Sequence, residues 1–383
     1  MEEFFAKFSF KKENEGLMGA EFEVIITAPD GSPSEAGFEI LKDTAGNNGA
    51  PFGEWEYSNG VISESYLEKS LQPAFQRGQF KPELFLEQVE YNTLPHYSLD
   101  GFEADLRAGY RAVIDMARRN GAISNFSGLP ILDGREVRIF PTKRYESIKE
   151  RVPDLMPGFT NSIHLHAGIV SPAEGIYLLN SLRVFLPQFL ALSANSAVGH
   201  GIIHLAESQR FLQHISFVKR LIPPYVRDEK RYVELMREQG CADDPDSCWW
   251  AIRLNKVGSI EIRIMDGQDR PEEAVFLARV WSSAVSRARE AFRRKISPDA
   301  VDSDAILEQC LQAAYFGLKS SRMKGMMHWF LAILDPYLDH ESRLKAKEVM
   351  MMEGIGSIRQ RKLWESSGSI EEYVGNYEKT IDP

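Results

Sequence analysis

Four strand-like segments carry charged or imidazole side chains where an alternating strand could have placed apolar ones. The residues are Glu21 with Glu23, His164 with His166, Glu261 with Arg263, and Glu90. The members of each pair are two residues apart, so their side chains project from the same face of a strand. Carboxylates packed this closely repel one another unless a cation neutralises them. Oxygen-rich ligand sets favour Mg²⁺ or Mn²⁺ over Zn²⁺, so the pattern predicts a magnesium site on a sheet.

Each pair also has an ordinary explanation when it is taken alone. A Glu-x-Glu pair is usually a solvated strand face, because glutamates are mostly exposed. His164 and His166 fit a buried histidine or a zinc pair equally well, and Glu261 with Arg263 fits a surface ion pair. The interpretation depends on the whole set, because four separate segments would each need an independent explanation. The sequence offers no Walker A motif, no glycine-rich dinucleotide loop and no Gly-x-Ser-x-Gly elbow.

Strand propensity and helical periodicity predict the elements that must position these residues. Strands are expected at 18–28, 84–93, 135–140, 161–169, 249–254 and 259–265, the last two forming a hairpin. Helices are expected at 102–120, 173–195 with a kink at Pro187, 271–295, and in several pieces between 304 and 364. Residues 1–170 therefore mix strands with one clear helix, and residues 171–383 are mostly helical around a strand hairpin at 249–266. This order predicts a single α+β domain spanning 1–383, with helices packed on one side of a mostly antiparallel sheet.

Composition limits the partners of the chain. It has 383 residues, 43% of them hydrophobic and 26% charged, as is usual for a globular protein with a large core. The net charge of -10 gives no electrostatic footprint for nucleic acid or an anionic membrane. No stretch reaches the ~18 apolar residues of a membrane helix, and the acidic N-terminus is unlike a signal peptide. We therefore expect a cytoplasmic protein with small-molecule partners.

Several short motifs occur in order between residues 18 and 361. They are G-A-E-F-E at 19–23, E-L-F-L-E-Q-V-E-Y-N-T at 83–93, R-Y at 144–145, S-I-H-L-H-A-G at 162–168, L-P and then L-A-L-S-A-N-S within 186–196, S-Q-R at 208–210, W-W-A-I-R and S-I-E-I-R within 249–263, and G-x-G-x-x-R-Q-R at 354–361. In this order they resemble the motifs of the carboxylate-amine ligases related to glutamate-cysteine ligase, including the YbdK-type enzymes. Each piece is short, but the ordered combination is specific.

The resemblance implies a glutamine-synthetase-like fold, in which an antiparallel sheet forms a funnel that holds ATP and two or three Mg²⁺ ions, with Mn²⁺ able to substitute. The implied metal ligands are Glu21, Glu23, Glu83, Glu90, His164 and Glu261. Arg263 and Glu261 are the implied catalytic residues, with Arg263 on the transferring phosphoryl group. Arg253, Arg210 and His166 are the implied contacts to ATP or substrate.

The reaction implied by the resemblance is the joining of a carboxylate to an amine. ATP would phosphorylate the carboxylate, the amine would displace phosphate from the resulting acyl phosphate, and ADP and phosphate would be released. Such a site needs positioning and cations more than a side-chain nucleophile. The resemblance also implies a homo-oligomer, such as a dimer.

The chain departs from the family pattern in three places. The stretch 127–130 has Leu129 where the pattern has histidine, and Tyr315 stands where the pattern has arginine. The stretch 33–80 is longer than expected and shows no family motif. These departures lie outside the implied metal set, so they leave the substrates open more than the ATP chemistry.

Three other readings of the sequence remain. The first is glutamate-cysteine ligase itself. The second is a metal-dependent hydrolase that uses His164 and His166 with a glutamate to activate water, prefers zinc and needs no ATP. The third is a binding protein without activity, which is disfavoured because buried carboxylates that nothing neutralises are costly to keep.

Overall fold

The computed structural model describes residues 1–45, 79–133, 137–140, 143–151, 158–218, 220–351 and 355–381. Most of the expected insertion at 33–80 therefore lies outside the described residues. Within them, seven strands form an antiparallel sheet with the order β2-β3-β1-β5-β9-β8, and β4 pairs with β1. The strands are β1 (Met18–Thr27), β2 (Phe80–Pro82), β3 (Gln88–Asn92), β4 (Ile123–Asn125), β5 (Ile163–Gly168), β8 (Ile252–Asn255) and β9 (Ser259–Ile262). A separate small ribbon joins β6 (Val198–Gly199) to β7 (Ile202–Ile203).

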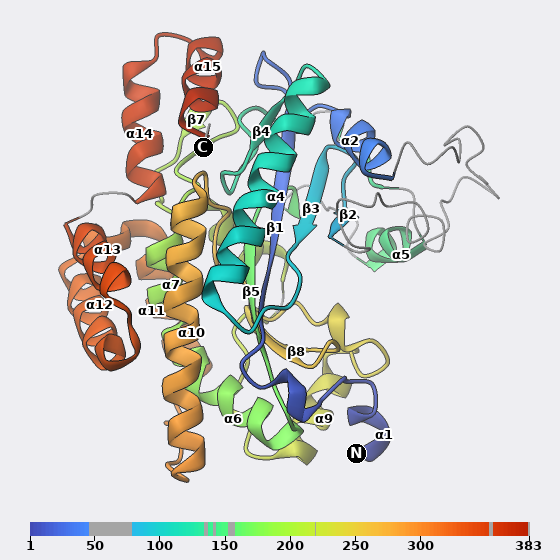
Figure 1. Cartoon of the computed structure of the whole chain (residues 1–383), viewed down its shortest axis with the longest axis vertical. Coiled ribbons are helices and arrows are strands. Elements are labelled where there is room, and N and C mark those ends of the chain that lie inside the picture. The colour runs from blue at the N-terminus through green and yellow to red at the C-terminus, as the bar shows by residue number, and fades with distance from the viewer. Residues whose placement is uncertain are drawn as a thin grey trace.

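Helices make up most of the second half of the chain, and the longest of them lie in front of the sheet in the view of Figure 1. Those before β8 are α1 (Glu2–Phe5), α2 (Ala36–Ala45), α4 (Leu99–Arg119), α5 (Lys143–Arg151), α6 (Pro172–Leu182), α7 (Leu186–Ser193), α8 (Gln209–Phe217) and α9 (Glu229–Glu238). Those after β9 are α10 (Pro271–Arg293), α11 (Ser303–Phe316), α12 (Ser321–Leu334), α13 (His340–Met350), α14 (Gly356–Ser366) and α15 (Ile370–Ile381). The predicted α+β class is confirmed.

Two predicted elements differ from the structure. The prediction of a strand at 135–140 is wrong for residues 137–140, the part of this range that the structure describes. One isolated bridge joins Ile139 to Phe85 there. The long helix expected at 173–195 is divided, because a 3-10 turn at Arg183–Phe185 separates α6 from α7. Pro187 lies in the first turn of α7, where its missing N–H leaves no hydrogen bond unmade. The proline therefore begins a new helix and does not kink a continuous one.

The helix pair α6–α7 is apolar enough to cross a membrane by length and composition. Of the most apolar window within Pro172–Ser193, 83% is buried inside the protein. Buried side chains of both helices, such as Leu178 and Leu190, belong to the main hydrophobic cluster of the protein. The pair therefore has the surroundings of core helices.

The central strand β1 has two different faces. Phe22, Val24 and Ile26 are buried in the main core, and the Phe22 ring lies 4.5 Å from the Tyr110 ring of α4. Glu21 and Glu23 alternate with these residues and therefore point to the opposite face. One face of the sheet thus packs against helices, and the other is left for polar side chains.

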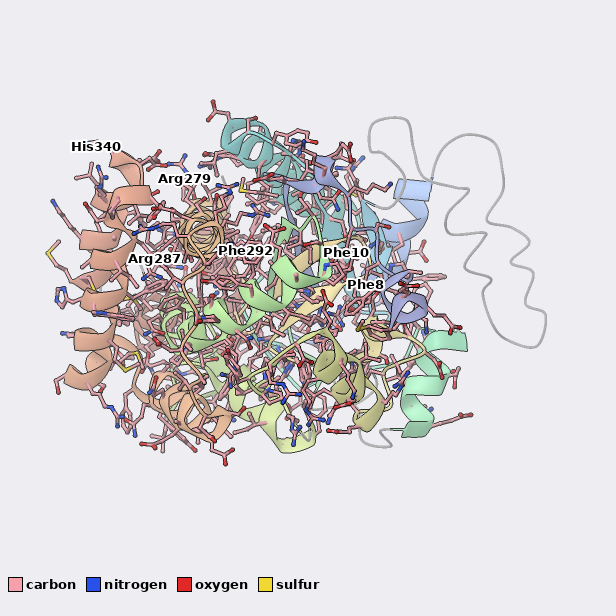
Figure 2. All side chains as sticks on the ribbon, turned by 90° about the horizontal axis from the view of Figure 1, so that it is seen from below. Phe8, Phe10, Arg279, Arg287, Phe292 and His340 are labelled. Carbon is pink, nitrogen blue, oxygen red and sulfur yellow. The ribbon has the colours of Figure 1, made fainter. Side chains whose placement is uncertain are left out.

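The helices that cover the sheet are tied to one another through α10. Arg279 lies on the side of α10 that faces α13, whose first residue is His340 (Figure 2). Its guanidinium donates to Glu341 Oε2 of α13 at 2.5 Å and to Glu103 Oε2 of α4 at 2.8 Å. Figure 2 also shows Phe8 and Phe10 near the N-terminus, where their rings stack at 5.2 Å. The contacts of Arg279 thus join α10 to both α13 and α4.

Gly109 marks a close approach between α4 and the sheet. A Cβ atom at this position would lie 2.4 Å from Cε1 of Tyr91, which is too close for any real contact. The Tyr91 ring cannot yield easily, because it is fully buried and its hydroxyl donates to Asp105 Oδ1 at 2.6 Å. The absence of a side chain at 109 therefore lets helix and strand meet.

We expect Gly109→Ala to lower the free energy of unfolding by about 1–3 kcal/mol, as overpacking does in other cores. This sign opposes helix propensity, which favours alanine over glycine by about 1 kcal/mol. Gly325→Ala is the matched control, because Gly325 is exposed within α12 and nothing lies within 4 Å of its added Cβ. Urea unfolding should show destabilisation for the first variant and stabilisation for the second. Stabilisation by both would contradict the packing described here.

Candidate functional site

The register of the antiparallel strands gathers polar side chains on one face of the sheet. Directly opposed residues on neighbouring strands project to the same side. From one edge of the sheet to the other, the opposed pairs are Lys81 with Glu90, Glu90 with Glu23, Glu21 with His164, His166 with Glu261, and Glu261 with Arg253. The pairs that were predicted to share a face within one strand therefore also share it between strands.

A cavity of about 310 Å³ opens on this polar face. Eight of the ten predicted site residues line it: Glu21, Glu23, Glu83, Glu90, His164, Arg210, Arg253 and Arg263. The other two, His166 and Glu261, are buried and contact Glu21 and Arg253 of this lining. The lining also includes apolar side chains such as Ile148, Phe217 and Trp249. The structure thus brings all ten predicted residues together.

Two groups of three side chains in this site can each converge on one metal ion. The first group is Glu23, Glu83 and Glu90, and the second is Glu21, His166 and Glu261. Within each group the candidate ligand atoms lie within 4.8 Å of one another. Five of the six ligands are carboxylates, which suits Mg²⁺ or Mn²⁺.

His166 has the surroundings of a metal ligand, although its sequence pattern was interpreted as a substrate contact. Its Nδ1 lies 2.9 Å from Ser259 Oγ. Its Nε2 is buried 3.4 Å from Glu21 Oε1, and no described residue forms a hydrogen bond with it. When Nδ1 carries the proton and donates to Ser259, Nε2 keeps a lone pair that faces the carboxylates. Burial lowers the pKa of His166, but the Glu21 carboxylate outweighs burial, so the net shift is upward. The unpartnered nitrogen therefore fits a cation at this position.

His164 lies between the two carboxylate groups. Its Nδ1 is 3.2 Å from Glu21 Oε2 and 3.6 Å from Glu261 Oε1, and its Nε2 is 3.7 Å from Glu23 Oε1. Burial and the nearby Arg263 guanidinium lower the pKa of His164 to about 4. The imidazole is therefore neutral near pH 7 and can act as a hydrogen-bond partner or a ligand to an ion on either side.

The carboxylates of the two groups differ in how the protein neutralises them. Burial raises the pKa of Glu261, but the Arg253 and Arg263 guanidinium groups outweigh burial and hold it well below its usual value. The pKa values of Glu23 and Glu90 are raised, mainly by burial. The group that contains Glu23 and Glu90 thus lacks enough positive charge from the described residues, as expected for a site that binds a cation.

We expect Mg²⁺ to stabilise the folded protein against heat, because binding confined to the folded state adds about 2.7 kcal/mol at a hundredfold excess over Kd. The rise in Tm should be largely lost in Glu90→Gln, which removes one ligand charge. Differential scanning fluorimetry at constant ionic strength, with Na⁺ as the control, measures both effects. A larger rise with Zn²⁺ than with Mg²⁺ would contradict the oxygen-rich assignment and favour a hydrolase.

The two arginines next to Glu261 have different surroundings. Arg253 is buried, donates to Glu261 Oε2 at 2.8 Å and to the Cys248 carbonyl at 3.0 Å, and also donates to the Asp246 carbonyl. The N–H donors of Arg253 are thus used within the protein, as expected for a residue that holds the Glu261 carboxylate in place. Arg263 pairs with Glu261 and lies 3.3 Å from His164 Nδ1, and 22% of its side chain is exposed in the cavity lining. Arg263 is therefore the better placed of the two to contact a ligand.

Several residues of the site were not predicted from the sequence. Ser162 donates from Oγ to Glu23 Oε2 at 2.7 Å and contacts His164 Nε2 at 2.7 Å. It stands two residues before His164, so the alternation of side chains along a strand could have placed it on the same face as His164. Thr160 and His214 also line the cavity and contact each other at 3.1 Å. They come from a loop and a helix, where no alternation pattern marks them.

Solved structures define the class of fold. A crystal structure of glutamate–cysteine ligase from Francisella tularensis in complex with AMP superposes with a TM-score of 0.68, covering 98% of this chain and 89% of that chain at 12% identity. A bifunctional glutathione synthetase from Pasteurella multocida gives a TM-score of 0.61, covering 96% of this chain and 52% of that chain at 14% identity. The protein therefore has the fold of glutamate–cysteine ligase.

Sequence comparison then gives the family. Residues 17–360 match the family model of glutamate-cysteine ligase family 2, and the chain belongs to this family. A relative from Roseiflexus castenholzii, provisionally named glutamate–cysteine ligase 2, is 26% identical over 304 residues, which cover 75% of this chain and 80% of the relative. A relative of the same name from Chloroflexus aurantiacus is 24% identical over 333 residues, covering 82% and 85%. By family, the chain is an ATP-dependent ligase that forms a carbon–nitrogen bond.

Proposed function

We propose that the protein joins a carboxylic acid to an amine, with Mg²⁺ and ATP, through an acyl phosphate. The observation that carries this proposal is the convergence of two ligand groups beside Arg263 in one cavity. A site that transfers a phosphoryl group to a carboxylate must bring two anions together, and it needs fixed positive charge to do so. The sequence of the chain, its fold and the chemistry of its ligand set agree with this reaction.

The reaction has two steps. In the first, an oxygen of the acid attacks the γ-phosphorus of ATP, the bond to the bridging oxygen breaks, and ADP leaves with that electron pair. In the second, a neutral amine attacks the acyl carbon, the carbon–oxygen bond to phosphate breaks, and the nitrogen loses a proton to give the amide. When bound, Mg²⁺ supplies positive charge that offsets the repulsion between the phosphoryl oxygens and the carboxylate.

The residues of this chain then have distinct roles. The six residues Glu21, Glu23, Glu83, Glu90, His166 and Glu261 would hold the ions, with His164 between the two groups. Arg263 would contact the transferring phosphoryl group, where a guanidinium fork matches the oxygens. Arg253 would keep Glu261 ionised and in place. We also propose a homo-oligomer in the cytoplasm, where ATP is available.

Glutamate–cysteine ligation remains one candidate within this class, because relatives carry that name. The fold alone does not select the acid or the amine. Leu129 and Tyr315, which stand where the family pattern has histidine and arginine, are consistent with a different substrate pair.

The direct test is ADP release by the wild-type protein with Mg²⁺, ATP and a panel of carboxylic acids that includes L-glutamate. Each acid is assayed without an amine, with amines that include L-cysteine, and with hydroxylamine, which converts any acyl phosphate to a hydroxamate. We expect ADP release to require Mg²⁺ and one class of acid, with hydroxamate formed in equal amount. Product formation without ATP, or hydrolysis supported best by Zn²⁺, would exclude the ligase mechanism.

A further inference from the structure

A fully buried aspartate, Asp266, lies four residues after the end of β9 and joins segments that are far apart in the sequence. Its Oδ2 accepts from Ser196 Oγ at 2.6 Å and from the Asn195 backbone N–H at 2.9 Å. Its Oδ1 accepts from Ser208 Oγ at 2.8 Å. All these groups are buried. Asp266 therefore holds both the 195–196 turn and the N-terminal cap of α8.

Among the described residues, one cation forms an ion pair with Asp266, the guanidinium of Arg210 on α8. Nη1 of Arg210 lies 3.9 Å from Asp266 Oδ1, and it donates to the Ile264 carbonyl at 3.2 Å. The backbone N–H of Arg210 donates to Ser196 Oγ at 3.1 Å, so the same aspartate also fixes the backbone through a serine. Asp266 thus positions the Arg210 guanidinium through the ion pair and the Arg210 backbone through Ser196.

Part of the Arg210 guanidinium remains available to a ligand. The side chain lines the cavity, and its Nε is buried without a hydrogen-bond partner among the described residues. A guanidinium has five N–H donors, and the contacts of Arg210 to the Ile264 and Arg263 carbonyls use only two of them. Buried donors of this kind are normally satisfied. The unsatisfied Nε–H, on a side chain that lines the cavity, therefore points to an acceptor that binds there.

The packing around Asp266 leaves little freedom for adjustment. A Cβ atom at Gly128 would lie 2.8 Å from Ser196 Cβ and 3.2 Å from Asp266 Cγ. The carboxylate is therefore enclosed on this side by backbone. An enclosed carboxylate at a fixed position holds its cation in one place, which a solvated ion pair does not.

We propose that Asp266 is a positioning residue, which holds the Arg210 guanidinium at the cavity so that it meets an anionic oxygen of a bound substrate. That oxygen belongs either to a phosphate of ATP or to the carboxylate of the acid. This inference rests on the proposed function, because ATP and the acid are the substrates of that reaction. Asp266 acts through Arg210 and does not itself touch the substrates.

Asp266→Asn tests the charge with little change of shape. An amide nitrogen in the place of Oδ1 can donate to Ser208 Oγ, and an amide oxygen in the place of Oδ2 still accepts from Ser196 Oγ and the Asn195 N–H. The network thus keeps its hydrogen bonds while Arg210 loses its counter-charge. We expect kcat/KM to fall about 10- to 100-fold, the cost of a small misplacement of a substrate-binding group. Ser208→Ala, which removes one hydrogen bond to the carboxylate, should give a smaller fall in the same parameter.

A double-mutant cycle with Arg210→Gln separates positioning from folding. If Asp266 acts through Arg210, then Asp266→Asn should cause no further loss in the Arg210→Gln background. Asp269→Asn is the matched control, because Asp269 is also buried but accepts from the Tyr377 hydroxyl at 2.7 Å and does not line this cavity. It should lower Tm without lowering kcat/KM.

Binding of Mg·AMP-PNP, followed by tryptophan fluorescence, identifies the anion without turnover, because Trp249 and Trp250 line the cavity. Weaker nucleotide binding in both single variants assigns Arg210 to a phosphate, and a raised KM for the acid alone assigns it to the carboxylate. Losses that add in the double variant, or full activity of Asp266→Asn, would overturn the inference. Wild-type protein that binds Mg·AMP-PNP but releases no ADP would instead count against the proposed function. The effects of the single and double variants on Mg·AMP-PNP binding would then still test the role of Asp266.

Discussion

Glu21→Gln is expected to lower Mg·ATP-dependent turnover by more than about 100-fold, because changes to residues that only orient metal ligands already cost 10- to 100-fold. Glu21 contacts both histidines of the site, with Oε2 3.2 Å from His164 Nδ1 and Oε1 3.4 Å from His166 Nε2. Glutamine keeps the shape of the side chain and removes the charge that would bind the ion. The loss should appear in steady-state ADP release at saturating ATP.

The variant should remain folded. A glutamine amide can still form a hydrogen bond with His164 Nδ1, as donor or as acceptor, and 20% of the Glu21 side chain is exposed, so the substitution introduces no unpaired buried charge. Glu103→Gln is the matched control, because Glu103 pairs with Arg107 and Arg279 on the helices behind the sheet. It should alter Tm slightly and leave turnover near the wild-type rate. Full activity of Glu21→Gln would show that the metal site is wrongly assigned.

Arg263→Gln is expected to lower kcat by about 10²- to 10³-fold, as removal of one group that stabilises transition-state charge does in other enzymes. The guanidinium reaches the cavity next to His164 and is positioned by Glu261. Its charge matters most when negative charge spreads over the transferring phosphoryl group, so kcat should fall more than KM rises. Arg263→Lys should recover only part of the rate, because an ammonium group lacks the planar fork.

Steady-state measurement of kcat and of KM for ATP tests this expectation. Arg107→Gln is a suitable control, since Arg107 pairs with Glu103 and Glu272 away from the cavity. A rise in KM with an unchanged kcat would mean that Arg263 contributes to ground-state binding only. That result would leave the ligase class intact but remove the catalytic role of Arg263.

The alternation of residues along a strand allowed most of the site to be predicted. Glu21, His164 and Glu261 each stand at alternate positions of strongly strand-like segments, so their shared faces followed from the sequence. The register between strands did not follow, because the pairing of Glu21 with His164 depends on long-range packing of β1 against β5. The same limit applies to Glu83, which reaches Glu23 from the segment between β2 and β3 and not from a strand.

Residues whose role depends on distant partners could not be predicted. Asp266 is an isolated aspartate in the sequence, and its importance comes from Ser196 and Ser208, which pack against it from other segments. The resemblance implied a contact of Arg253 with ATP or substrate, but the hydrogen bond from Arg253 to the Cys248 carbonyl exists only in the folded chain and could not be predicted. The strands β2 and β4 have three residues each, too few to show an alternating pattern.

Transfer of oxygen from the acid to phosphate tests the central claim most directly. An acid that supports ADP release is labelled with ¹⁸O in its carboxylate, and the phosphate released with the amide is analysed by mass spectrometry. If the carboxylate is activated as an acyl phosphate, each phosphate released must carry one oxygen from the acid. Unlabelled phosphate released alongside the amide would mean that the oxygen lost by the acid left as water, and it would contradict activation by phosphorylation.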